Sequence, residues 1–150
     1  MSLEIERKFL VSALPEDYRN HPKCRIEQAY LCVSPVVRVR RSNDDYYLTY
    51  KGSGLLVREE ANLPLSEEGY RHLLAKADGN IIAKDRYCIP YQGYTIELDV
   101  FDPPFAPLVV AEVEFSTEEE ALAFCPPVWF GEEVTYDGAY TNAALSRKVF

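Results

Sequence analysis

The chain has 150 residues, of which 47% are hydrophobic, so it is long enough to bury a core and short for two independent domains. Sixteen Lys and Arg stand against twenty-four Asp and Glu, and the formal charge of -8 argues against nonspecific binding of long polyanions such as nucleic acid. No stretch of about eighteen residues is free of charge, and the N-terminus lacks the apolar segment of a signal peptide. We therefore expect residues 1–150 to form a single cytoplasmic domain.

Alternation of apolar and polar residues dominates the chain and is typical of β-strands that bury one face. It predicts six strands, at residues 3–11, 25–32, 36–41, 46–51, 95–101 and 108–115. Weaker alternation predicts two more strands, at residues 55–63 and 81–89. Turn-forming residues at 42–45 and 52–54 fit hairpin connections between neighbouring strands. The pattern favours an α+β fold built on an antiparallel sheet of eight strands.

Helices are expected to be few and short. Ser66 opens a predicted helix that continues through Ala77. Thr117 and Glu120 form a capping box at the start of a second helix. A third helix is predicted from about Thr141 to the C-terminus.

Cysteine and histidine show no catalytic or metal-binding pattern. Cys24, Cys32, Cys88 and Cys125 lie far apart, which favours reduced, mostly buried thiols over disulfides or a zinc site. His21 and His72 have no second ligand at a suitable spacing, so we expect them to have surface or packing roles.

In several of the predicted strands, charged residues occupy one face, whereas the opposite face is apolar. Acids occupy alternate positions in some strands, as Glu4 and Glu6 do, and bases do so in others, as Arg38 and Arg40 do. The charged set comprises seven acids and seven bases: Glu4, Glu6, Glu60, Glu97, Asp99, Glu112, Glu114, Lys8, Arg38, Arg40, Lys51, Arg58, Lys84 and Arg86. The apolar faces need a covering layer, so the charged faces either meet water on an open sheet or meet one another inside a hydrated barrel.

The segregation of like charges has a chemical meaning. Opposite charges on neighbouring strands would be more stable, so like-charged pairs require external counter-ions. Carboxylates bind hard cations such as Mg²⁺ or Mn²⁺, and guanidinium groups bind phosphate. The pattern indicates a metal–polyphosphate site, and a merely charged, solvated sheet is the alternative.

The motif Glu4-x-Glu6-x-Lys8 in the first predicted strand is the hallmark of the CYTH superfamily, the triphosphate tunnel metalloenzymes. The chain resembles the short bacterial single-domain members over nearly its whole length. The rest of the matching series is QAYL at 28–31, Arg38-x-Arg40, LTYKG at 48–52, Arg58 with Glu60, Lys84-x-Arg86, ELDVF at 97–101, Glu112-x-Glu114 and EVTYDGAYTNAALS at 133–146. The resemblance implies an eight-stranded antiparallel β-barrel, a tunnel with helices packed on its outside, that binds a triphosphate with Mg²⁺ or Mn²⁺ in its lumen.

The resemblance also implies roles for individual residues. The metal ligands it implies are Glu4, Glu6, Glu112 and Glu114. The substrate-binding residues it implies are Lys8, Arg38, Arg40, Lys51, Arg58, Lys84 and Arg86. Catalytic roles are implied for Glu4, Glu6 and Lys8, with one of the carboxylates orienting the attacking water.

Four further positions are relevant to the predicted site. Tyr30 in QAYL is similar to a tyrosine proposed as a proton acceptor, and a hydrogen-bonding role in the site is the alternative. Asn62 is a departure, because many relatives carry an acid there. Glu97 and Asp99 are expected mainly to orient the basic side chains, and metal binding is the alternative.

The activity implied is metal-dependent hydrolysis of a small linear triphosphate, most simply inorganic tripolyphosphate, with release of orthophosphate. Two alternatives stay open: an adenylyl cyclase of the same superfamily, and a polyphosphate-binding module without turnover. We expect a small triphosphate as the partner, and neither a membrane nor nucleic acid. A homodimer stays open.

Overall fold

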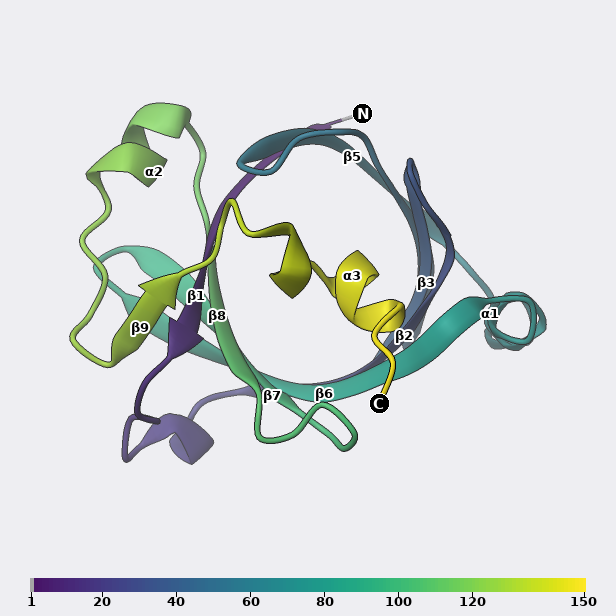
Figure 1. Cartoon of the computed structure of the whole chain (residues 1–150), viewed down its shortest axis with the longest axis horizontal. Coiled ribbons are helices and arrows are strands. Elements are labelled where there is room, and N and C mark those ends of the chain that lie inside the picture. Colours follow the sequence, from purple (N-terminus) through teal and green to yellow (C-terminus); the bar gives the residue numbers. More distant parts are fainter. Residues whose placement is uncertain (1) are drawn as a thin grey trace.

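The computed structural model describes residues 2–150, and its strands close into one antiparallel barrel (Figure 1). The barrel strands are β1 (Ser2–Val11), β2 (Lys23–Val33), β3 (Val36–Ser42), β4 (Asp45–Lys51), β5 (Val57–Pro64), β6 (Asp78–Tyr91), β7 (Tyr94–Phe101) and β8 (Val109–Glu114). Neighbours follow the order β5-β4-β3-β2-β6-β7-β8-β1, and pairing of β5 with β1 closes the ring. The predicted α+β fold, an eight-stranded antiparallel β-barrel with helices outside it, is confirmed.

The helices lie outside the barrel wall or across its end. They are α1 (Glu67–Leu74), α2 (Glu118–Ala123), α3 (Asn142–Ser146) and two 3₁₀ turns, η1 (Tyr18–Asn20) and η2 (Gly138–Tyr140). The predicted caps form, because Ser66 Oγ accepts a hydrogen bond from the Gly69 amide and Thr117 Oγ1 accepts one from the Glu120 amide.

Two helix predictions were too long, and one strand was missed. The helix predicted to reach Ala77 ends at Leu74, because the chain turns there to enter β6 at Asp78. The last helix ends at Ser146 and does not reach the C-terminus. A ninth strand, β9 (Phe130–Glu133), pairs with β1 and is too short to show an alternating pattern.

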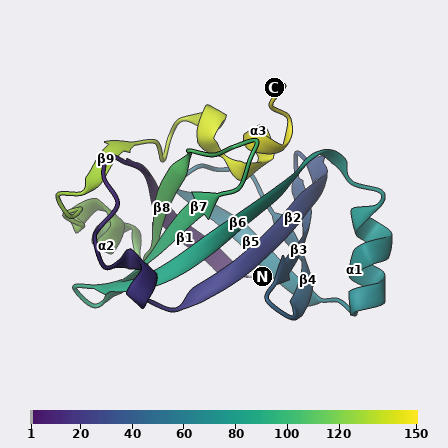
Figure 2. The ribbon, with the colours of Figure 1, turned by 90° about the horizontal axis from the view of Figure 1, so that it is seen from below.

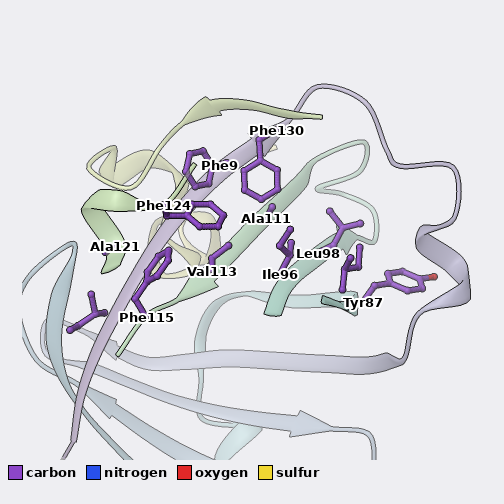
Figure 3. Close-up of a cluster of buried hydrophobic side chains, with 12 residues drawn as sticks. Phe9, Tyr87, Ile96, Leu98, Ala111, Val113, Phe115, Ala121, Phe124 and Phe130 are labelled. Atoms are coloured by element: carbon purple, nitrogen blue, oxygen red, sulfur yellow. The ribbon is translucent and has the colours of Figure 1, made fainter. Parts of the chain in front are cut away.

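The main hydrophobic core lies on the outside of the barrel wall. Apolar residues of β1, β6, β7 and β8, such as Phe9, Leu98 and Val113, point away from the lumen and are buried. Figure 3 shows Phe124 and Phe130 packing over them from the α2–β9 segment. Burial of this face against α2 and β9 leaves the charged face of the same strands directed into the barrel.

Arg7 is the outward-facing base of β1 and fixes this covering segment. Its guanidinium donates to both carboxylate oxygens of Glu133 at 2.8 and 2.7 Å. It also donates to the backbone carbonyls of Ala121 and Phe124 at 2.8 and 3.1 Å. Arg7 therefore satisfies carbonyl groups at the end of α2 and ties the segment to the barrel.

One end of the barrel is covered by α3 (Figures 1 and 2). Leu145 of α3 is buried in a second apolar cluster that fills this end, together with Ile82, Phe101, Phe105 and Val110. Ile82 and Val110 have the same strand phase as the charged inward residues that follow them in β6 and β8. The lumen thus changes from apolar under α3 to charged farther along its axis.

The cysteine prediction was only partly right. All four cysteines are free, but Cys24, Cys32 and Cys88 are half-buried and Cys125 is exposed. Cys125 lies in the connection between α2 and β9. Within residues 2–150, no helix has the length and apolar character that crossing a membrane requires.

Candidate active site

A cavity of about 340 Å³ lies inside the barrel. It brings together eleven of the twelve residues predicted for the site: Glu4, Glu6, Lys8, Tyr30, Arg38, Arg40, Lys51, Arg58, Arg86, Glu112 and Glu114. The strand period of two explains this convergence, because alternate residues on seven strands face the same interior. Lys84 is the exception, since it is fully buried and does not line the cavity.

The first part of the site joins β1, β4 and β5. Lys51 Nζ donates to both oxygens of Glu4 at 2.8 and 2.9 Å and lies 3.4 Å from a Glu60 oxygen. Arg58, the cross-strand partner of Glu4, approaches it at 3.7 Å. Burial and a hydrogen bond with Glu60 raise the pKa of Glu4 to about 8, whereas the same hydrogen bond lowers the pKa of Glu60 to about 2. The contact between the two carboxyl groups therefore shifts their pKa values in opposite directions.

The second part of the site is a pair of acids on β1 and β8. Glu6 and Glu114 are direct cross-strand partners, and neither makes an ion pair with a base anywhere in residues 2–150. Burial raises the pKa of both, and in each case a nearby carboxylate adds to the shift: Glu112 for Glu6 and Glu60 for Glu114. Like charges directly opposite one another destabilise a sheet, so this pair calls for a cation.

Glu112 differs from those two acids because bases surround it. Lys8 is its cross-strand partner and lies 3.5 Å away, and Arg86 lies 3.7 Å away. Burial alone would raise the pKa of Glu112, but these cations outweigh it and hold the pKa well below the usual range. Residues 2–150 contain no group of three or more Asp, Glu, His or Cys side chains arranged so that they could hold a metal ion. Of the four predicted metal ligands, Glu4 and Glu112 are thus paired with bases, and Glu6 and Glu114 are not.

The third part of the site is a pair of guanidinium groups on β3. Arg38 and Arg40 are buried, and neither forms an ion pair with a carboxylate in the described part of the chain. Burial, Arg38 and Arg86 lower the pKa of Arg40 to about 10. Two adjacent buried cations without anionic partners form an anion-binding wall.

The fourth part lies beneath the cavity, where Asp99 is fully buried between two bases. Lys84 Nζ lies 2.7 Å from one Asp99 oxygen, and Arg86 donates to both oxygens at 2.7 and 2.9 Å. Arg86 also donates to Glu97 at 3.1 Å. These contacts agree with the expectation that Asp99 and Glu97 orient basic side chains.

Tyr30 and Asn62 both line the cavity. Tyr30 is buried on β2, where Arg38 is its cross-strand partner. Asn62 Nδ2 donates to Glu60 at 2.9 Å, so the amide that replaces the expected acid is engaged with the nearby carboxylate.

Several neutral residues of the site were not predicted. Tyr47, Thr141 and Asn142 line the cavity, and Thr49 and Gln28 contact its guanidinium groups. Tyr47 and Thr49 share the strand phase of Lys51, and Gln28 shares that of Tyr30, so the alternation contained a signal for them. Asn142 carries no such signal, because it comes from α3 at the end of the barrel; its Oδ1 accepts a hydrogen bond from Lys84 at 3.3 Å.

The sequence model of the CYTH domain family matches residues 2–124 of this chain. The chain belongs to the CYTH family. Two curated members are similar over nearly their full length, and both are named inorganic triphosphatase: one from Nitrosomonas europaea is 39% identical over 97% of this chain and 98% of its own, and one from Acetivibrio thermocellus is 35% identical over 100% and 97%.

A solved structure agrees with this family assignment. The crystal structure of an inorganic triphosphatase superposes with a TM-score of 0.73 and 35% identity, covering 99% of this chain and 97% of the other. The predicted membership of the CYTH superfamily is therefore confirmed.

Proposed function

We propose that this chain is a metal-dependent triphosphatase that cleaves the terminal phosphoanhydride of a small linear triphosphate and releases orthophosphate. Inorganic tripolyphosphate is the simplest substrate, and the two full-length relatives named inorganic triphosphatase support this choice. One structural observation carries the proposal. The same cavity holds two guanidinium groups, Arg38 and Arg40, and two facing carboxylates, Glu6 and Glu114, and none of the four has an oppositely charged ion-pair partner in residues 2–150. An anion with a divalent cation satisfies both.

The acid pair fits a divalent cation. Members of this family are metalloenzymes, and carboxylate oxygens are the ligands that Mg²⁺ and Mn²⁺ prefer. Glu6 and Glu114 face each other with no basic ion-pair partner in the described part of the chain, so a cation between them would remove their repulsion. When bound, a divalent cation draws charge from phosphate oxygens and makes a neighbouring water more acidic. Glu4 and Glu112 would complete the ligand set after releasing Lys51 and Lys8.

The remaining residues bind and orient the substrate. Phosphoryl transfer has a loose transition state with charge spread over the transferred group, so positioned cations lower the barrier with little covalent chemistry from the protein. Arg38 and Arg40 bind phosphate oxygens from β3, and Lys51, Arg58 and Lys8 approach from β4, β5 and β1, which follow β3 in order round the barrel. A carboxylate, Glu4 or Glu6, orients the attacking water.

The test is orthophosphate release from tripolyphosphate, ATP, thiamine triphosphate and long-chain polyphosphate, each with Mg²⁺ and with Mn²⁺. We expect tripolyphosphate to be cleaved, and we expect Glu4→Gln and Glu6→Gln to lower kcat/KM by roughly a hundredfold or more. Glu59→Gln makes the same change of charge on the exposed face of β5 and should leave the rate unchanged.

Three outcomes would contradict the proposal. Full activity in both inward variants would remove the carboxylates from the mechanism. Formation of cyclic AMP and pyrophosphate from ATP would identify a cyclase. Tight binding of tripolyphosphate without metal-stimulated release would identify a binding module.

A further inference from the structure

The two unpaired guanidinium groups of the cavity are held by neutral side chains. Gln28 Oε1 accepts a hydrogen bond from Arg40 Nε at 2.6 Å, and Thr49 Oγ1 accepts one from Arg38 Nη2 at 3.1 Å. Both Gln28 and Thr49 are 0% exposed. Each guanidinium is thus oriented by a neutral acceptor, and neither has a carboxylate at ion-pair distance among residues 2–150.

The strand register builds these contacts. Gln28 is the cross-strand partner of Arg40 between β2 and β3, and Thr49 is that of Arg38 between β3 and β4. Thr49 donates its hydroxyl proton to Asn62 Oδ1 at 2.5 Å, which leaves its oxygen lone pairs for Arg38. Gln28 Nε2 has no hydrogen-bond partner in residues 2–150, so Arg40 alone determines which way the amide points.

Arg86 shows the contrasting arrangement within the same barrel. Its guanidinium lies against three carboxylates, with Asp99 at 2.7 Å, Glu97 at 3.1 Å and Glu112 at 3.7 Å. The charge of Arg86 is therefore compensated by carboxylates of the protein, although its side chain lines the same cavity as those of Arg38 and Arg40.

We propose that Gln28 and Thr49 are positioning residues that orient Arg40 and Arg38 toward an anionic phosphate chain while leaving their positive charge uncompensated. The proposal rests on the proposed function, because it takes the anion to be the triphosphate substrate. A carboxylate at either position would orient the guanidinium equally well but would neutralise it. The amide and the hydroxyl supply direction without charge.

Gln28→Glu separates the two effects, because it keeps the size of the side chain and adds one negative charge. The new carboxylate pairs with Arg40, so the affinity of metal-free protein for tripolyphosphate, measured by titration calorimetry, should fall roughly tenfold to a hundredfold. KM should rise by a similar factor and kcat should change less. The melting temperature should not fall, because the variant gains an ion pair.

Gln92→Glu is the matched control. It makes the same substitution in the exposed turn between β6 and β7, outside the cavity, and should leave both affinity and KM at the wild-type values. A loss of affinity of equal size in this variant would mean that overall charge, and not the position of Gln28, sets the affinity, and would overturn the proposal.

Two further variants remove the acceptor without adding charge. Gln28→Met and Thr49→Val keep the side-chain volume, so KM should rise by roughly threefold to tenfold as the guanidinium loses its orientation. A purely structural role would lower the melting temperature and leave KM unchanged, which would overturn the proposal. These two variants also decide the question if Gln28→Glu fails to fold.

The inference and the proposed function fail in different ways. If Gln28→Glu and Gln28→Met bind tripolyphosphate as tightly as the wild type does, the inference is overturned and the proposed hydrolysis is unaffected. Absence of orthophosphate release by the wild type overturns the function, while the ratio of metal-free affinities still decides the inference. A wild type that does not bind tripolyphosphate overturns both.

Discussion

At the scale of single residues, two arginines that both line the cavity, Arg86 and Arg38, have opposite surroundings. Within residues 2–150, Arg86 contacts three carboxylates, whereas Arg38 contacts none and leaves its Nε without a partner. A buried charge that has lost its partner is costly, whereas loss of an unpartnered charge removes a cost. The basic residues that resemble one phosphate clamp in the sequence therefore make unequal contributions to stability.

This difference predicts how two alanine variants diverge. Arg86→Ala leaves Asp99 and Glu97 without their main donor and should lower the free energy of unfolding by roughly 3–5 kcal/mol. Arg38→Ala should change it by less than about 1 kcal/mol, because no carboxylate loses a partner, while KM for tripolyphosphate rises tenfold or more. Urea unfolding and steady-state kinetics measure the two effects. Equal destabilisation by both variants would contradict the assignment of partners.

The acid pair gives a second prediction at this scale. Glu114→Gln removes one of the two facing charges, so the melting temperature of the metal-free protein should be unchanged or higher. The rise in melting temperature on adding Mn²⁺ should be smaller than in the wild type, because the cation loses a ligand. Glu68→Gln on the exposed side of α1 is the control. A Mn²⁺-induced rise as large as in the wild type would remove Glu114 from the metal ligands.

At the scale of elements, the junction between β6 and α3 determines how one end of the barrel is covered. Gly79 has φ +75°, and a Cβ atom there would lie 2.2 Å from the Ser146 carbonyl oxygen. Asn80 Nδ2 then donates to the carbonyls of Leu145 at 3.2 Å and Lys148 at 2.8 Å. These side-chain bonds satisfy carbonyl groups at the end of α3 and tie that end to β6.

Substitution of Gly79 should therefore displace α3. Gly79→Ala forces the Ser146 backbone away, so hydrogen exchange in α3 should speed up by tenfold or more and Leu145 should leave its apolar cluster. Gly138→Ala is the control, because a Cβ atom at Gly138 meets nothing within 4 Å. Unchanged exchange in α3 of Gly79→Ala would show that the close approach is not needed to hold it.

At the scale of the whole molecule, the barrel strands direct charged side chains into the lumen and buried apolar side chains outward. Opposite charges balance in the cavity, where six acids and six bases line the wall: Glu4, Glu6, Glu60, Glu97, Glu112, Glu114, Lys8, Arg38, Arg40, Lys51, Arg58 and Arg86. The net charge of -8 therefore belongs to the rest of the protein. Only an anion small enough to enter the barrel reaches the guanidinium wall.

This distribution predicts selectivity by size. A fluorescently labelled single-stranded oligonucleotide should not bind at low ionic strength, because the outer acids repel it. The same oligonucleotide should not compete with tripolyphosphate in the hydrolysis assay. Fluorescence anisotropy measures the first effect, and displacement of tripolyphosphate by the oligonucleotide would contradict the expected distribution of charge.

The fold was largely predictable because most of the barrel strands alternate clearly between apolar and polar residues. The segments that were missed or misjudged are short and depend on contacts made elsewhere. Strand β9 has only four residues and exists because β1 offers it an edge. The end of α3 is tied to β6 by Asn80, which is 65 residues away from Leu145 in the chain.

The sequence by itself determined the strands, the inward face and the set of charges that meet there, since the strand period of two is a local property of the backbone. Tertiary structure decided which of those charges are already paired. Arg86 and Arg38 have the same strand phase in the sequence, but the register of β7 places Asp99 and Glu97 against the first, and the register of β4 places Thr49 against the second. Pairing across strands depends on register and closure, which no single segment encodes, and it separates the charges that hold the barrel together from those left free for a ligand.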